Sequence, residues 1–75
     1  MAVNLGYFYA EIEDATNQCI GLFSSTNPNQ AGPTSLGTTI VEIPVYDEEY
    51  FLKYYINGSW YEDADGMIPW QSSML

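Results

Sequence analysis

The clearest fold signal in this chain is the stretch KYYINGSWYE, residues 53–62. Its centre is Asn57-Gly58, a dipeptide preferred in the two-residue type I′ turn, where both residues need a positive φ. Short runs rich in tyrosine, tryptophan and isoleucine lie on either side, and such residues favour strands. The stretch therefore predicts a tight β-hairpin in the C-terminal half of the chain.

A second hairpin is predicted nearer the N-terminus, because residues 6–13 alternate between apolar and polar side chains. One face of this strand takes Phe8, Ala10 and Ile12, and the other takes Tyr7, Tyr9, Glu11 and Glu13. Residues 14–17 predict a turn, since Asp and Asn form local backbone hydrogen bonds. Residues 18–23 predict the antiparallel partner strand, whose apolar content is Cys19, Ile20 and Leu22.

The segment between the hairpins predicts a loop, a strand and a helical turn. Residues 24–37 are polar, with two prolines and two glycines, and predict a long surface loop that can be functional. Residues 38–43 are mostly β-branched and predict a third strand, which Pro44 ends because proline has no N–H. Asp47 is placed to cap one or two helical turns in residues 46–53. Residues 67–75 predict an extended C-terminal tail.

The predicted fold class is mainly β: a small antiparallel sheet of about five strands, built from two hairpins, with one short helical turn. The 75 residues suffice for a single domain. The predicted core comprises Phe8, Ala10, Ile12, Ile20, Leu22, Val41 and Ile43. A core this small leaves a stability of roughly 3–5 kcal/mol, and chains of this size usually add disulfides, a metal or a partner surface. With one cysteine and no histidine, a partner or homo-oligomerisation is the expected source of further stability.

The charge balance is strongly acidic, with ten Asp and Glu residues against one basic residue, Lys53, and a net charge of −9. This balance disfavours binding to nucleic acid, which needs clustered Lys and Arg, and binding to an anionic membrane surface. The 47% hydrophobic content separates the chain from disordered acidic tails. Residues 1–5 lack the basic region of a secretory signal, so we expect the protein to be made in the cytoplasm.

The residues available for chemistry predict a protein that is not an enzyme and that holds no cofactor or metal. There is no histidine to act as general base. Cys19 has no basic neighbour in sequence and is expected to be a small buried hydrophobe. A glycosidase pair among the carboxylates would need a cleft that a small sheet is not expected to enclose. Asp63-x-Asp65-Gly66 opens like a calcium loop, but Met74 occupies the closing position, so we predict a polar turn.

The densest aromatic group is the candidate partner-binding site. It comprises Tyr54, Tyr55, Trp60, Tyr61 and Trp70. Seven tyrosines, three phenylalanines and two tryptophans exceed what one thin core encloses, so we expect an exposed aromatic strip here. Full burial of all five side chains is the alternative.

Two sets of residues resemble short proteins of tailed bacteriophages. The opening hairpin carries Tyr9-Ala10-x-Ile12 and Asp14-x-x-Asn17-x-Cys19-x-Gly21. The second half carries Val41-Glu42-Ile43, Tyr46-Asp47, Lys53-Tyr54-Tyr55 and Asn57-Gly58-x-Trp60-Tyr61-Glu62. The resemblance spans residues 7–62 and its motifs are structural; the tail, residues 63–75, departs from the pattern. It implies a virion accessory protein, similar to tail-associated proteins or tail-fibre assembly chaperones.

The leading hypothesis is therefore a bacteriophage structural accessory protein, located in the virion, that binds another virion protein at the tail fibre or baseplate. A tail-fibre assembly chaperone is an alternative within the same resemblance. The net charge of −9 motivates a different alternative, an inhibitor that mimics DNA and binds a host nucleic-acid-binding protein. Aromatic side chains beside carboxylates also leave open a sugar-binding adhesin module.

Overall fold

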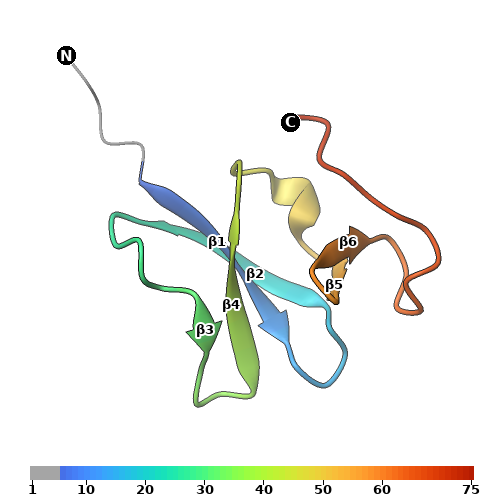
Figure 1. Cartoon of the computed structure of the whole chain (residues 1–75), viewed down its shortest axis with the longest axis horizontal. Coiled ribbons are helices and arrows are strands. Elements are labelled where there is room, and N and C mark those ends of the chain that lie inside the picture. Colours follow the sequence, from blue (N-terminus) through green and yellow to red (C-terminus); the bar gives the residue numbers. More distant parts are fainter. Residues whose placement is uncertain (1–5) are drawn as a thin grey trace.

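The computed structural model describes residues 6–75, and its regular secondary structure is short strands plus one 3-10 turn, joined by turns and loops (Figure 1). The elements in chain order are β1 (Tyr7–Glu13), β2 (Cys19–Ser25), β3 (Gly32–Pro33), β4 (Thr38–Ile43), the 3-10 helix η1 (Glu48–Tyr50), β5 (Tyr54–Ile56) and β6 (Ser59–Tyr61). One antiparallel sheet has the order β2-β1-β4-β3, and β5 and β6 form a second sheet of two strands. The mainly-β class is confirmed; the second hairpin forms its own sheet.

The β1–β2 hairpin contains a bulge that changes which side chains of β2 face the core. Glu11 pairs with Gly21 but Ile12 pairs with Cys19, so Ile20 is the extra residue opposite β1. Cys19 therefore turns inward and is fully buried, whereas Ile20 is 40% exposed. The prediction that Cys19 is a buried hydrophobe is confirmed. The prediction that Ile20 belongs to the core is wrong, because simple alternation ignores the bulge.

The main core lies on one face of the larger sheet. It consists of Ala10, Ile12, Cys19, Ile43 and Tyr50, with Phe8, Leu22, Val41, Val45, Tyr55, Trp60 and Trp70 packed against it. The elements that follow β4 cover this face: η1, the β5–β6 hairpin and the tail. Of the predicted core residues, all but Ile20 belong to this assembly.

The opposite face of the sheet is also covered at one point, which sequence alternation did not predict. Tyr9 was assigned to the polar face of β1, yet it is 0% exposed. Its ring stacks on Phe23 at 5.3 Å between centroids, and its hydroxyl donates a 2.7 Å hydrogen bond to the carbonyl of Asn27. The connection from β2 to β3 thus crosses the sheet over Tyr9 and buries it.

The predicted loop over residues 24–37 is shorter and more ordered than expected. Strand β2 continues to Ser25, and Gly32 and Pro33 pair with Ile40 and Thr39 of β4. Polar side chains in this segment form local hydrogen bonds: the amide of Asn29 donates to Asn27 Oδ1, and Thr34 Oγ1 lies 2.7 Å from Thr38 Oγ1. The turn-forming residues of this segment therefore flank a strand of two residues.

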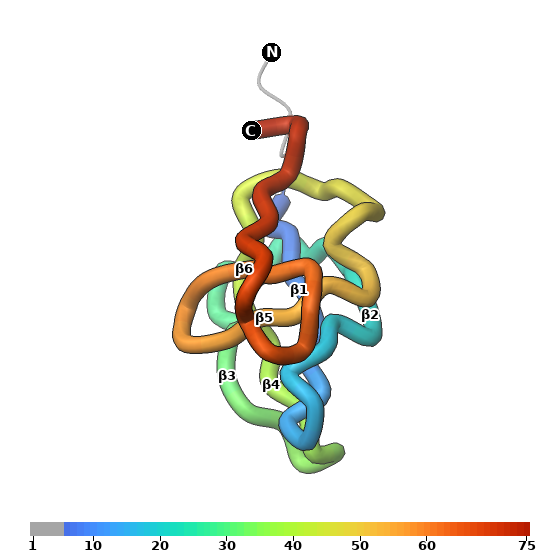
Figure 2. Tube along the Cα trace, turned by 90° about the vertical axis from the view of Figure 1, so that its right-hand side faces the viewer, coloured from blue at the N-terminus to red at the C-terminus, as the bar shows by residue number. Residues whose placement is uncertain are grey.

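The C-terminal half wraps back on itself beside the larger sheet. Asn57 and Gly58 have φ values of 51° and 84°, as the predicted type I′ turn requires. The tail then runs back along β6, where the amide of Trp70 donates to the carbonyl of Trp60 at 3.0 Å. Figure 2, viewed from this side, shows the tail in red lying over β5 and β6. The extended tail thus packs on the second sheet.

Neither a membrane-crossing helix nor a metal-binding cluster occurs in the described chain. Within residues 6–75, no helix is long and apolar enough to span a bilayer. The same residues contain no group of three or more Cys, Asp and Glu side chains placed to hold a metal ion. Asp63 instead accepts hydrogen bonds from the amides of Met67 and Ile68, which closes the predicted polar turn.

Candidate protein-binding groove

The five aromatic residues predicted as the partner-binding site do not form an exposed strip. Tyr54, Tyr55, Trp60, Tyr61 and Trp70 are all partly buried. Tyr55 pairs with Trp60 across the hairpin, and Tyr54 pairs with Tyr61, so the two pairs lie on opposite faces of the second sheet. The structure therefore brings together only part of the predicted set.

Two members of that set pack against Tyr50, a residue that the sequence did not single out, and a third packs against one of them. The ring centroid of Tyr50 lies 4.8 Å from that of Trp60 and 4.9 Å from that of Trp70, both edge-on. Tyr55 lies 5.0 Å from Trp60. Such edge-to-face packing stabilises a cluster beyond its area burial. This cluster attaches η1 to the second hairpin and the tail, and Tyr50 is 2% exposed.

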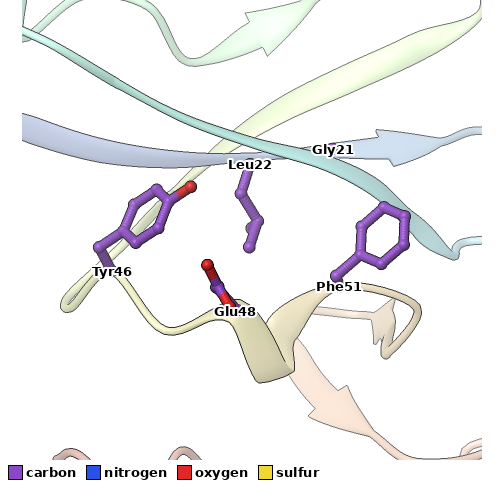
Figure 3. Close-up of a pocket in the computed structure, with 5 residues that line it drawn as sticks. All are labelled: Gly21, Leu22, Tyr46, Glu48 and Phe51. Carbon is purple, nitrogen blue, oxygen red and sulfur yellow. The ribbon is translucent and has the colours of Figure 1, made fainter.

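Exposed apolar side chains beside a concavity lie elsewhere, next to η1 and the edge of β2; others are scattered over the tail and the β3–β4 turn. A hollow of about 430 Å³ opens between β2 and η1. Its lining comprises Gly21, Leu22, Tyr46, Glu48 and Phe51. Figure 3 shows Leu22 pointing from β2 toward η1, with the rings of Tyr46 and Phe51 on either side and Glu48 between them. We call this hollow the β2–η1 groove.

The walls of the groove are aromatic and accessible. Phe51 is 47% exposed, and Tyr46 is also among the exposed large side chains. The ring of Tyr46 is held edge-on against Phe8 at 6.0 Å between centroids, which fixes one wall to β1. Leu52, which follows Phe51, is exposed as well. Large apolar side chains gathered beside a concavity are typical of protein-binding sites.

The position of η1 is determined by hydrogen bonds of Asp47. Its Oδ1 accepts a 2.9 Å bond from the amide of Glu49, which is the N-cap interaction predicted from sequence. Its Oδ2 accepts a bond from the hydroxyl of Ser72, and both residues are buried. The Ser72 hydroxyl and the Glu49 amide hold the pKa of Asp47 below its usual range. The tail therefore anchors the turn that carries Glu48 and Phe51.

The edge of β2 forms the other side of the groove. The amide of Cys19 donates to the carbonyl of Lys53 at 2.8 Å, and the amide of Leu52 donates to the carbonyl of Cys19 at 2.9 Å. These two bonds hold the chain after η1 against the start of β2. Burial raises the pKa of the Cys19 thiol, which donates a weak 3.3 Å hydrogen bond to the carbonyl of Gly21. Cys19 thus contributes packing to this wall.

Sequence reasoning missed Tyr46, Glu48 and Phe51 as site residues, although one signal was available. In a single 3-10 turn, side chains three positions apart share a side. Once Tyr50 is directed into the core, Glu48 and Phe51 lie together on another side of η1. The cap at Asp47 and the end of β4 before Pro44 fix where this turn begins.

Comparison of the chain with known proteins gave no match. No protein-family model matches the chain, and no curated protein and no solved structure matches it.

Proposed function

We propose that this chain is a non-catalytic accessory protein that binds another protein through the β2–η1 groove. The observation that carries the proposal is the groove itself: an apolar hollow with Leu22 at its base and two accessible aromatic walls, Tyr46 and Phe51. Aromatic side chains that are anchored by other contacts bind with little loss of conformational entropy. Tyr46 is anchored in this way by Phe8.

The small size of the molecule supports the same proposal. A domain of 75 residues has limited capacity to bury its own apolar surface. Several large apolar side chains remain exposed at or next to the groove, namely Tyr46, Phe51 and Leu52. A partner that covers them would remove apolar surface from water, which stabilises the complex by about 25 cal/mol for each Å² buried.

We further propose that the partner is a virion protein of a tailed bacteriophage, at the tail fibre or baseplate. The support is the resemblance of residues 7–62 to short phage tail proteins. In this role the protein either remains in the virion or acts as a tail-fibre assembly chaperone. The alternative DNA mimic would need a concentrated acidic surface, whereas the ten acidic residues are distributed over β1 and the turn after it, β4, η1 and its cap, and the segment after β6.

Site-specific photo-crosslinking during phage infection tests both parts of the proposal. Benzoylphenylalanine replaces Phe51 in the groove or, as a control, Leu36, which is 80% exposed in the turn between β3 and β4. That turn lies at the opposite end of the sheet from η1 (Figure 1). We expect a single crosslinked virion protein from position 51 and none from position 36.

Mass spectrometry of purified virions then distinguishes the two virion roles. A fixed stoichiometric ratio indicates a structural component, and absence from the particle despite a groove crosslink indicates a chaperone. A crosslink from position 51 to a host DNA-binding protein, lost when DNA is added, would replace the virion proposal with the DNA mimic. Equal crosslinking from both positions would remove the groove as the binding site.

A further inference from the structure

The edge of β2 that borders the groove has backbone groups available for a further strand. β2 is an outer strand of its sheet, with β1 on its inner side. Within residues 6–75, Cys19 is the β2 residue whose backbone bonds to a segment outside the sheet. An open strand edge is a template for pairing with an extended segment of another protein.

The bulge determines which residues present these groups. In an antiparallel pair, successive residues alternate between facing the partner strand and facing away from it. Cys19 faces away from β1, because its N–H and C=O bond to Lys53 and Leu52. The bulge places both Ile20 and Gly21 opposite Glu11, so the alternation resumes with Leu22 and Ser24 facing away. Their N–H and C=O groups point to the open edge.

The chain itself shows how a segment pairs at this edge. Residues 52–54 lie along the start of β2, with Gln18 bridged to Tyr54 in antiparallel fashion. Going back from Leu52, the chain departs from the edge into η1, and the groove opens at that point beside Gly21 and Leu22. An incoming strand would continue the line that residues 52–54 begin, over Leu22 and Ser24.

The charge of the site specifies the chemistry of the incoming segment. Glu48 lies between the two aromatic walls of the groove (Figure 3). The chain has a net charge of −9, and the ammonium of its one basic residue, Lys53, lies 5.0 Å from the ring centroid of Trp70. A second copy would bring two strongly acidic chains together with a Glu48 carboxylate in each groove, and like charges across an interface are costly. A cationic segment is complementary.

We propose that β2 binds an extended, lysine- or arginine-bearing segment of the partner protein as an additional strand. Backbone hydrogen bonds form at Leu22 and Ser24, an apolar side chain of the segment enters the groove between Tyr46 and Phe51, and a flanking cation pairs with Glu48. This inference rests on the proposed function, because it specifies how the same groove recognises its partner.

The test uses the full chain labelled with ¹⁵N and a synthetic heptapeptide with acetylated and amidated ends. The peptide has threonine at odd positions, leucine at position four and lysine at positions two and six, so that leucine and both lysines share one face of a strand. We expect amide shifts confined to residues 19–25 and 46–53, and slower hydrogen exchange at Leu22 and Ser24. The analogue with glutamate in place of lysine should bind at least about tenfold more weakly at low salt.

Matched variants separate strand addition from general attraction. Glu48→Gln should weaken binding by about two- to fivefold, the range of an exposed ion pair, whereas Glu49→Gln on the same turn should not. Ser24→Pro removes one outward N–H and should abolish exchange protection at the edge, while the spectrum of the free variant reports that the fold is retained. Two further peptides carry N-methyl groups on the backbone nitrogens of either the odd or the even residues. The peptide whose methyl groups point away from β2 should bind, and the one whose methyl groups point toward β2 should not.

The proposal is overturned by no amide shift at millimolar peptide, by equal affinity for the lysine and glutamate peptides, or by binding without edge protection. Self-association that protects Leu22 and Ser24 in the absence of peptide overturns it in favour of a second copy. In each of these cases a crosslink from position 51 still supports protein binding by the groove, so failure of the strand proposal is distinguishable from failure of the proposed function.

Discussion

The hydroxyl of Ser72 donates a hydrogen bond to Oδ2 of Asp47, a residue 25 positions earlier in the chain, and both side chains are buried. This bond joins the C-terminal tail to the cap of η1. Because Glu48 lies in η1 and Phe51 caps its C-terminal end, the geometry of the groove depends on a contact made by the tail.

The Asp47 cap predicts a dependence of stability on pH. Its pKa is lowered in the folded protein, by the Ser72 hydroxyl and the Glu49 amide, from an ordinary value of 3.8. Below that value the unfolded chain binds more protons than the folded chain does. The stability that the Asp47 carboxylate contributes is therefore present above about pH 4 and is lost as the pH falls through the folded pKa. Urea unfolding at pH values between about 5 and 2 should therefore show a steeper loss for the native chain than for Asp47→Asn.

A second carboxylate should contribute to the same pH dependence. The pKa of Asp63 is also lowered, chiefly by its hydrogen bond from the amide of Ile68, so Asp63→Asn should flatten the acid limb as well. Identical acid limbs for the native chain and Asp47→Asn would contradict a role of the cap in stability.

Cys19 should be unreactive in the folded protein. It is 0% exposed, and burial raises the pKa of its thiol, so both access and thiolate fraction are low near neutral pH. Ellman's reagent at pH 8 should therefore label the thiol slowly in buffer and rapidly in denaturing urea. Rapid labelling of the folded chain, at the rate of a free thiol, would show that the wall of β2 opens readily.

The two aromatic groups should respond differently to truncation. Trp60→Ala removes contacts with Tyr50 and Tyr55 and should cost about 3 kcal/mol of unfolding free energy, close to the whole stability expected of a domain this small. Phe51→Ala removes a side chain that is 47% exposed and should cost less than about 1 kcal/mol. Urea unfolding monitored by circular dichroism measures both, and Trp60→Phe serves as the milder variant for Trp60.

Phe51→Ala and the milder Trp60→Phe separate a role in structure from a role in binding. We expect the Phe51→Ala chain to fold but no longer to bind its partner. We expect the Trp60→Phe chain to bind as the native chain does. The reverse pattern would return the binding site to the aromatic group predicted from sequence.

The free edge of β2 should be visible by hydrogen exchange in the isolated protein. Amides that face β1, such as Phe23, which pairs with Tyr9, should exchange slowly, whereas those of Leu22 and Ser24 should exchange quickly. Two-dimensional NMR after transfer to D₂O measures the rates residue by residue. Equal protection of Leu22 and Phe23 would mean that the edge is already occupied in solution.

The features that the sequence alone determined are those that local chemistry specifies. Asn57-Gly58 forms the type I′ turn because both residues adopt a positive φ at little cost, and Asp47 caps η1 through an amide two residues away. The alternation along β1 correctly placed Phe8, Ala10 and Ile12 on the core side. Each of these inferences depends on residues close together in the chain.

Only the tertiary structure decided which apolar surfaces are covered. Tyr9 is buried because the β2–β3 connection crosses its face, and Ile20 is exposed because a bulge shifts the register of β2. Trp60 and Trp70 are packed on Tyr50, so the exposed aromatic walls belong to Tyr46 and Phe51 instead. The sequence around a hydrophobic side chain looks the same whether a distant segment covers that side chain or leaves it exposed to a partner. Whether such a segment covers it depends on the path of the whole chain.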